Sequence, residues 1–132
     1  MTEENNDYAV EMKGKNGVVR IINACRYSAQ GFQAAFKNEA AFRQLVLLNA
    51  VSIPLIVFID FSISVKMILL FATMLTLIVE LFNTAIEAIV DRVSLEKHPL
   101  SKIAKDAGSA AQTMALLILS VMWLVALWDY FD

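Results

Sequence analysis

A row of polar side chains interrupts one of the most apolar segments of the chain. The segment 67–90 carries Glu80, Asn83 and Glu87, and Asp91 follows it directly. Their spacing of i, i+3, i+7 and i+11 places all four on one narrow face of a helix. A charged side chain at the centre of a bilayer costs roughly 2.5–3.5 kcal/mol, so this face should meet protein, water or a ligand. The pattern favours a functional site built from carboxylates at a membrane surface.

Three apolar stretches dominate the composition. Of the 132 residues, 58% are hydrophobic, which is high for a soluble domain of this size. The runs 45–59 and 107–128 carry no charge, and 67–90 carries only two glutamates. A helix needs about 20 apolar residues to cross a bilayer. We therefore predict an all-α membrane protein with transmembrane helices over about 44–65, 67–91 and 107–128.

The region before the first span has a different character. Residues 1–16 are polar, and we expect them to form a mobile tail. Apolar residues then recur at helical spacing, so we predict an amphipathic surface helix over about 17–41, with a possible break at Gly31. Glu39 lies at the edge of its apolar stripe, which would hold this carboxylate near the membrane surface. The whole of 17–132 is expected to form a single domain.

The distribution of charge indicates an orientation and excludes some kinds of site. Lys and Arg gather before the first span and between the second and third, which places the N-terminus and that second loop in the cytoplasm. A single cysteine, Cys25, and a single histidine, His98, exclude a zinc site of Cys or His ligands within one chain. The sequence has neither a GxxxxGK[ST] loop nor a GxGxxG loop, which excludes a P-loop or kinase-type nucleotide site. Small residues around Gly108 allow the third span to approach another helix closely.

The carboxylates of the polar row should have different roles. Glu80 and Glu87 lie about 10 Å apart along a helix axis, too far to share one proton or one ion. Glu87, nearer the cytoplasm, could bind a hydrated Mg²⁺ together with Glu39, while the deeper Glu80 could accept a proton from a lipid hydroxyl. Asn83 would orient either group, and Lys105 could meet phosphate. Two alternatives remain open: polar residues that only hold helices together, and a proton or ion pathway in an oligomer.

Three segments of the chain resemble the signature segments of prokaryotic diacylglycerol kinase, a small membrane lipid kinase. They are NEAAFRQ at 38–44, ELFNTAIEAIVDR at 80–92 and KDAGSAA at 105–111. The resemblance implies a homotrimer of three-span chains in the bacterial inner membrane, with no nucleic-acid partner. It implies transfer of the γ-phosphoryl group of MgATP to diacylglycerol, giving phosphatidic acid. Related enzymes that phosphorylate undecaprenol are the second substrate class.

The resemblance also implies roles for individual residues. Glu80 would be the catalytic base, supported by Asn83, and Glu39 and Glu87 would bind the metal. Leu45 follows NEAAFRQ where relatives often carry Glu, so this chain must act without that carboxylate. The implied ATP contacts are Arg20, Tyr27, Glu39, Glu87, Glu96, Lys97, His98, Lys105 and Asp106. The implied lipid contacts are Ser28, Ala41, Phe42, Arg43, Gln44, Phe58, Asp60, Lys66, Glu80, Ser109, Trp123 and Trp128.

Overall fold

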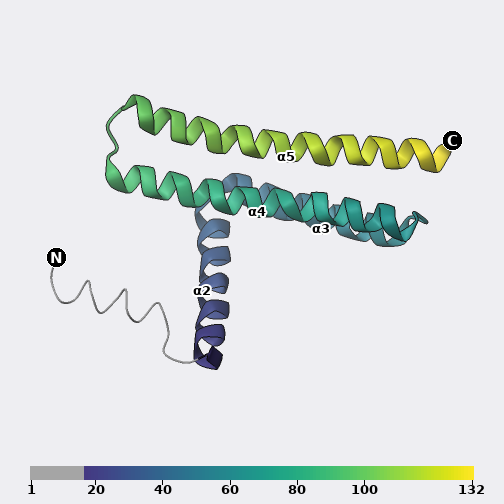
Figure 1. Ribbon diagram of the computed structural model, residues 1–132, viewed down its shortest axis with the longest axis horizontal. Helices are drawn as coiled ribbons and strands as arrows, with labels where there is room; N and C mark the ends of the chain where they lie inside the picture. The colour runs from purple at the N-terminus through teal and green to yellow at the C-terminus, as the bar shows by residue number, and fades with distance from the viewer. Residues whose placement is uncertain (1–16) are drawn as a thin grey trace. The chain divides into compact units, whose positions relative to one another are not determined.

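The structure, a computed structural model, describes residues 17–132 and is all-helical over that range. This confirms the predicted fold class. The expected mobile tail, 1–16, lies outside the described residues. The helices, shown in Figure 1, are α2 (Gly17–Asn38), α3 (Ala40–Phe58), α4 (Ile63–Val93) and α5 (Pro99–Phe131).

The structure separates α2 from the other helices at Glu39. This residue has extended backbone (φ −113°, ψ 112°), so α2 ends before the predicted limit of about 41 and α3 begins at Ala40. The chain divides at this point into two compact parts. Within the first, α2 continues through Gly31, so the expected break is absent from this described helix.

Helices α3, α4 and α5 are each long and apolar enough to cross a membrane, as predicted. The helix boundaries differ from the predicted spans at two places. Helix α3 ends at Phe58 and α4 begins at Ile63, so the predicted first span, about 44–65, includes the turn between them. Helix α5 begins at Pro99, ahead of the predicted third span, because proline suits the first helical position, where its missing N–H costs nothing. His98 Nδ1 accepts a hydrogen bond from the Leu100 N–H (3.2 Å) and caps this end. The loop between α4 and α5 is therefore only 94–98, and Lys105 lies on a helix.

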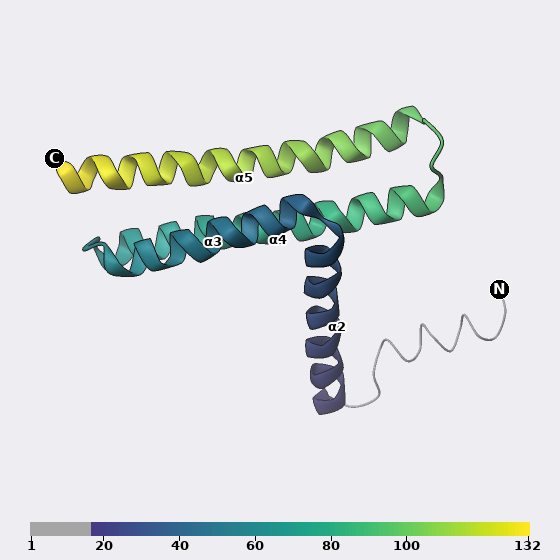
Figure 2. The ribbon, with the colours of Figure 1, turned by 180° about the vertical axis from the view of Figure 1, so that it is seen from behind.

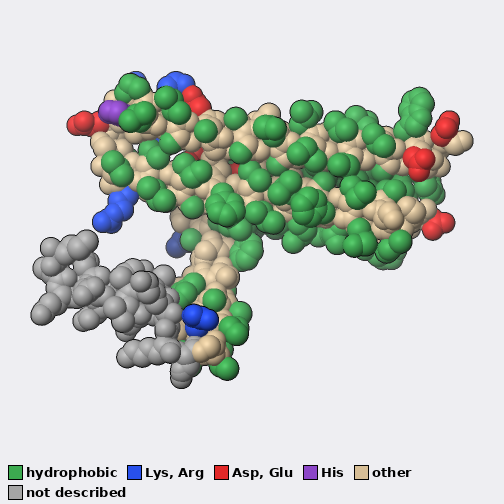
Figure 3. Space-filling view, in the orientation of Figure 1, with side chains coloured by type: hydrophobic (Ala, Val, Ile, Leu, Met, Phe, Trp, Pro, Cys, Tyr) green, Lys and Arg blue, Asp and Glu red, His purple; other side chains and the backbone are tan. Residues whose placement is uncertain are grey.

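Helix α4 packs against both α3 and α5 and runs antiparallel to each of them (Figures 1 and 2). Apolar side chains cover the length of these helices, and charged ones gather near the ends (Figure 3). At the α3–α4 turn, Ile56, Phe61, Leu69 and Ala126 form a buried cluster. Trp123 meets Phe61 edge to face, with ring centroids 6.1 Å apart. A surface this apolar suits contact with lipid rather than with water.

Buried polar residues join α3 to α4. Asn49, Ser52, Thr73 and Thr76, here called the polar seam, are all nearly inaccessible. Asn49 Nδ2 donates to Thr76 Oγ1 (3.3 Å) and to a carbonyl of its own helix (2.9 Å). The Thr73 and Thr76 hydroxyls donate to carbonyls of α4, each at 2.7 Å. Polar groups at this depth must find partners within the protein, so the seam fixes the register of α3 on α4.

A double-mutant cycle tests the one bond of the seam that crosses between helices. We expect Asn49→Ala and Thr76→Ala to couple by about 0.6 kcal/mol, the average for such bonds within a membrane. Unfolding of the detergent-solubilised protein measures the four free energies. The control pairs Asn49→Ala with Thr113→Ala, whose exposed hydroxyl bonds only to its own helix. Purely additive losses for Asn49 and Thr76 would contradict this role.

Candidate active site

Glu80 is the buried carboxylate of α4, with only 4% of its surface exposed. The Asn83 side chain lies within hydrogen-bonding reach of the Glu80 carboxylate. Glu87 and Glu39 lie near enough for their charges to act on it. Glu80, Asn83 and Glu87 share one face of α4, and Glu39 stands at the break before α3. The structure therefore brings together the four residues predicted to carry the chemistry.

Such an arrangement suits a divalent cation that is only partly held by protein. Carboxylates kept close together repel one another unless a proton or a cation compensates their charge. Among residues 17–132, no group of three acidic, His or Cys side chains is placed to hold a metal by itself. Mg²⁺ does not require one, since it commonly takes one or two carboxylates and completes its shell with water and substrate phosphates.

Gly108 allows α5 to approach α4 beside this site. A Cβ atom placed on Gly108 would overlap Asn83 Oδ1 and lie 3.3 Å from Asn83 Cγ. Gly108 is buried, so no space remains there for a larger side chain. The close approach expected from the small residues of this segment is therefore confirmed at Gly108, and its partner is Asn83 of the polar row.

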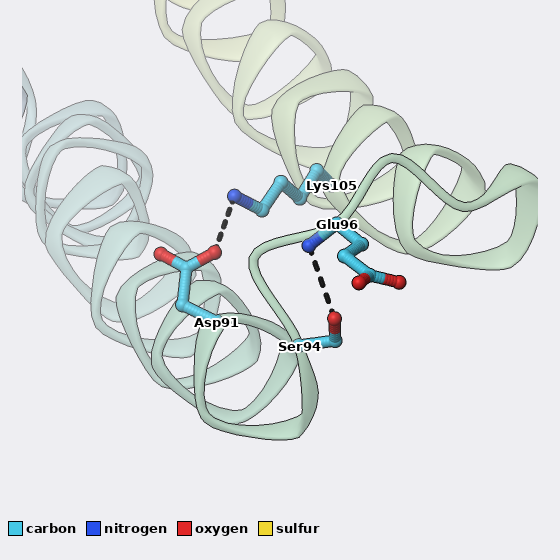
Figure 4. Close-up of polar contacts among 4 residues, drawn as sticks. All are labelled: Asp91, Ser94, Glu96 and Lys105. Atoms are coloured by element: carbon cyan, nitrogen blue, oxygen red, sulfur yellow. Dashed lines mark hydrogen bonds and ion pairs between the residues drawn. The ribbon is translucent and has the colours of Figure 1, made fainter.

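A cavity of about 770 Å³ opens where α4 turns into α5. Lys105 Nζ and Asp91 Oδ1 form an ion pair of 2.6 Å across it, and Ser94 Oγ accepts a hydrogen bond from the Glu96 N–H (3.0 Å), as Figure 4 shows. The structure places five predicted ATP contacts in the lining of this cavity. They are Glu96, Lys97, His98, Lys105 and Asp106.

Several predicted lipid contacts lie far from Glu80 in a single chain. Lys66 is fourteen residues before Glu80 on α4, about 21 Å along the helix, and its Nζ donates to the Val57 carbonyl (2.9 Å). The others at the α3–α4 end are Phe58, Asp60, Trp123 and Trp128. Ala41, Phe42, Arg43 and Gln44 lie in the first turn or so of α3, and Ser109 follows Gly108 on α5. Arg20, Tyr27 and Ser28 belong to α2, the other compact part. These assignments stay predictions.

Comparison with known proteins decides the family. Residues 26–127 match the family described as prokaryotic diacylglycerol kinase. The chain belongs to this family. It is 59% identical over 111 residues to the diacylglycerol kinase of Pseudomonas aeruginosa, covering 84% of this chain and 90% of that protein. It is 42% identical over 115 residues to the diacylglycerol kinase of Escherichia coli K12, covering 87% of this chain and 94% of that protein. The diacylglycerol kinase of Helicobacter pylori 26695 is 38% identical to this chain over 117 residues, covering 89% of this chain and 91% of that protein.

Sequence reasoning missed two polar features of this diacylglycerol kinase family member. The first is the polar seam, although Thr73 and Thr76 continue the spacing of Glu80 and Asn83 along the same helix. The second is Gln112, which follows Gly108 by one helical turn and buries both atoms of its amide. The available signal was the one amide side chain of the uncharged run 107–128, four positions after a glycine.

Proposed function

We propose that this chain transfers the γ-phosphoryl group of ATP to diacylglycerol, forming phosphatidic acid and ADP, at the cytoplasmic face of the bacterial inner membrane. Family membership over 26–127 and the names of the relatives support the reaction. The observation that carries it is the combination of a buried carboxylate, Glu80, with a cavity that contains Lys105 at the end of the same helix pair. The charge asymmetry of the loops supports the orientation.

In the proposed reaction, Glu80 is the general base. Its carboxylate accepts the proton of the free glycerol hydroxyl while that oxygen attacks the γ-phosphorus. The new bond joins the lipid oxygen to phosphorus, and the bond from the γ-phosphorus to the β–γ bridging oxygen breaks, so that ADP leaves. Asn83, within hydrogen-bonding reach of Glu80, orients the carboxylate. Burial excludes water, which would otherwise compete for the phosphoryl group.

Glu39 and Glu87 are the residues that would hold Mg²⁺. Their fit rests on two observations: both offer carboxylate oxygens, and both lie near enough to Glu80 for their charges to act on it. When bound, the ion would neutralise charge on the transferring phosphates. In the α4–α5 cavity, Lys105 would exchange its ion pair with Asp91 for contact with phosphate oxygens.

We further propose that three chains assemble as a homotrimer. Within one chain, α3–α5 leave extensive apolar surface exposed, which another subunit or lipid must cover. The separation of Glu80 from Glu87 by about 10 Å along α4 also suits a site to which more than one chain contributes. Crosslinking or native mass spectrometry of the solubilised protein would test the number of subunits.

One assay tests the substrate class. The purified protein in mixed micelles receives labelled ATP and Mg²⁺ with diacylglycerol and undecaprenol side by side. We expect labelled phosphatidic acid to dominate. If labelled undecaprenyl phosphate were the main product, undecaprenol would be the substrate instead of diacylglycerol. Absence of any labelled lipid, together with Glu80-dependent ion flux in liposomes, would instead support a conduit.

Lys105→Met should weaken nucleotide binding. We expect the KM for ATP to rise about 10- to 100-fold, because a charge-assisted bond to phosphate contributes roughly 1.5–3 kcal/mol. The KM for diacylglycerol should change little. Lys102→Met provides the comparison, since Lys102 is more exposed and pairs with Asp106 one turn along its own helix; its effect should be smaller. Steady-state kinetics with each substrate varied in turn measures both, and an unchanged KM for ATP in Lys105→Met would contradict the assignment.

A further inference from the structure

Gln112 carries a buried amide whose hydrogen bonds the described chain does not supply. Both Nε2 and Oε1 are inaccessible, and neither has a partner within residues 17–132. The residue as a whole is only partly buried, so other atoms of Gln112 lie at the surface of the helix pair. An unpaired amide in an apolar surrounding is costly, and the cost falls when a ligand or another chain supplies the missing partners.

Helix geometry places Gln112 at the level of the turn of α4 that contains the candidate base. Gly108 touches Asn83, so these two residues lie at the same level of the antiparallel helices α5 and α4. Gln112 follows Gly108 by four residues, about 6 Å along α5, and lies on the same face of that helix. Because α4 runs antiparallel to α5, the same distance along α4 is covered by moving about four residues toward its N-terminus. From Asn83, this shift reaches the turn that contains Glu80. Asn83 Oδ1, one helical turn away at the level of Gly108, is also buried and without a partner within residues 17–132.

We propose that Gln112 is a substrate-contacting residue that hydrogen-bonds an acyl ester carbonyl of the lipid while Glu80 receives the hydroxyl proton. The proposal rests on the proposed lipid kinase function and adds a specificity determinant to it. A diacylglycerol molecule that presents its hydroxyl to Glu80 carries its nearest ester group only a few bonds away. The Gln112 Nε2–H is a donor, and the ester carbonyl is an acceptor that hydrocarbon leaves unpaired. Gln112 would thereby favour ester-linked lipids over alcohols that lack the carbonyl.

A comparison of two lipids in one variant tests this contact. Gln112→Met keeps the length of the side chain and removes the amide. Diacylglycerol and the matching ether-linked dialkylglycerol are offered in mixed micelles, and kcat and KM are determined for each. We expect Gln112→Met to lower kcat/KM about five- to tenfold for diacylglycerol, mainly through KM, as expected for loss of one hydrogen bond. The dialkylglycerol should lose almost nothing, because it cannot accept that bond.

The ratio of kcat/KM for diacylglycerol to kcat/KM for dialkylglycerol does not depend on how much of the variant is folded. Gln112→Leu gives the same comparison should the methionine variant fail to assemble. Ser120→Ala is the matched control, because its exposed hydroxyl bonds only to the Leu116 carbonyl of its own helix; its ratio should equal that of the wild type. The KM for ATP should also stay unchanged in Gln112→Met.

The remaining outcomes would overturn the contact. Equal losses with both lipids, accompanied by weaker subunit assembly, would assign the amide to a contact between chains. Unchanged kinetics with both lipids would leave Gln112 without a role in substrate binding. A wild-type protein that labels neither lipid would refute the proposed function itself, which is a separate result from a change in the ratio.

Discussion

Glu80→Gln is expected to lower kcat for lipid phosphorylation by about 10²–10⁴-fold, the range that a positioned general base contributes. The substituted amide has the size of the carboxylate but cannot accept the hydroxyl proton at the moment of attack. Stability should be retained or rise, since a neutral amide is less costly to bury at this 4% exposed position than a carboxylate. Initial rates with saturating lipid and ATP, together with thermal unfolding in detergent, measure both quantities.

The control for Glu80→Gln is Asp129→Asn, an acid-to-amide change at an exposed position near the end of α5, far along the chain from the candidate site. It should keep wild-type turnover. Binding of ATP to Glu80→Gln should also be preserved, because Glu80 is assigned to the lipid hydroxyl and the cavity of Lys105 to the nucleotide. Near-normal turnover in Glu80→Gln would contradict the role of Glu80 as base, independently of the roles assigned to the other residues of the site.

The polar row could be predicted from the sequence because its residues lie close together on one helix, and because polar side chains within an apolar span cost free energy unless they have a role. Four polar residues at helical spacing within a hydrophobic run identify one face of one helix, and the structure indeed places Glu80, Asn83 and Glu87 together, with Glu39 nearby. The three apolar spans were predictable for the same reason, since their composition alone distinguishes them from soluble helices. The signature segments then supplied the family, which the comparisons confirm.

The remaining features depend on contacts between helices, which periodicity does not encode. Asn49 is a single amide in an uncharged run, and only the packing of α3 on α4 pairs it with Thr76. The start of α5 at Pro99 involves capping by His98, whereas hydropathy identifies only the apolar part of this helix, from about 107. Gln112 becomes informative only once Gly108 is known to touch Asn83.

Gly108→Ala is expected to be the most damaging of the conservative changes outside the carboxylates. The new methyl group would overlap Asn83 Oδ1, so Asn83 or α5 must move. Overpacking of this kind costs about 1–3 kcal/mol of stability. Displacement of Asn83 would also release Glu80 from the group that we propose to orient it, and misplacement of a reacting group by 1 Å can cost about 10²-fold in rate.

Gly31→Ala separates this effect from the general consequences of replacing a helical glycine. No atom lies within 4 Å of a Cβ placed there, and Gly31 is exposed within α2. Alanine should therefore be neutral or stabilise the helix by about 0.5–1 kcal/mol, with turnover unchanged. Adding Asn83→Ala to Gly108→Ala should restore the stability, because the obstructing side chain is then absent, but should not restore turnover. Wild-type stability and turnover in Gly108→Ala would show that α5 does not need this close approach to assemble the site.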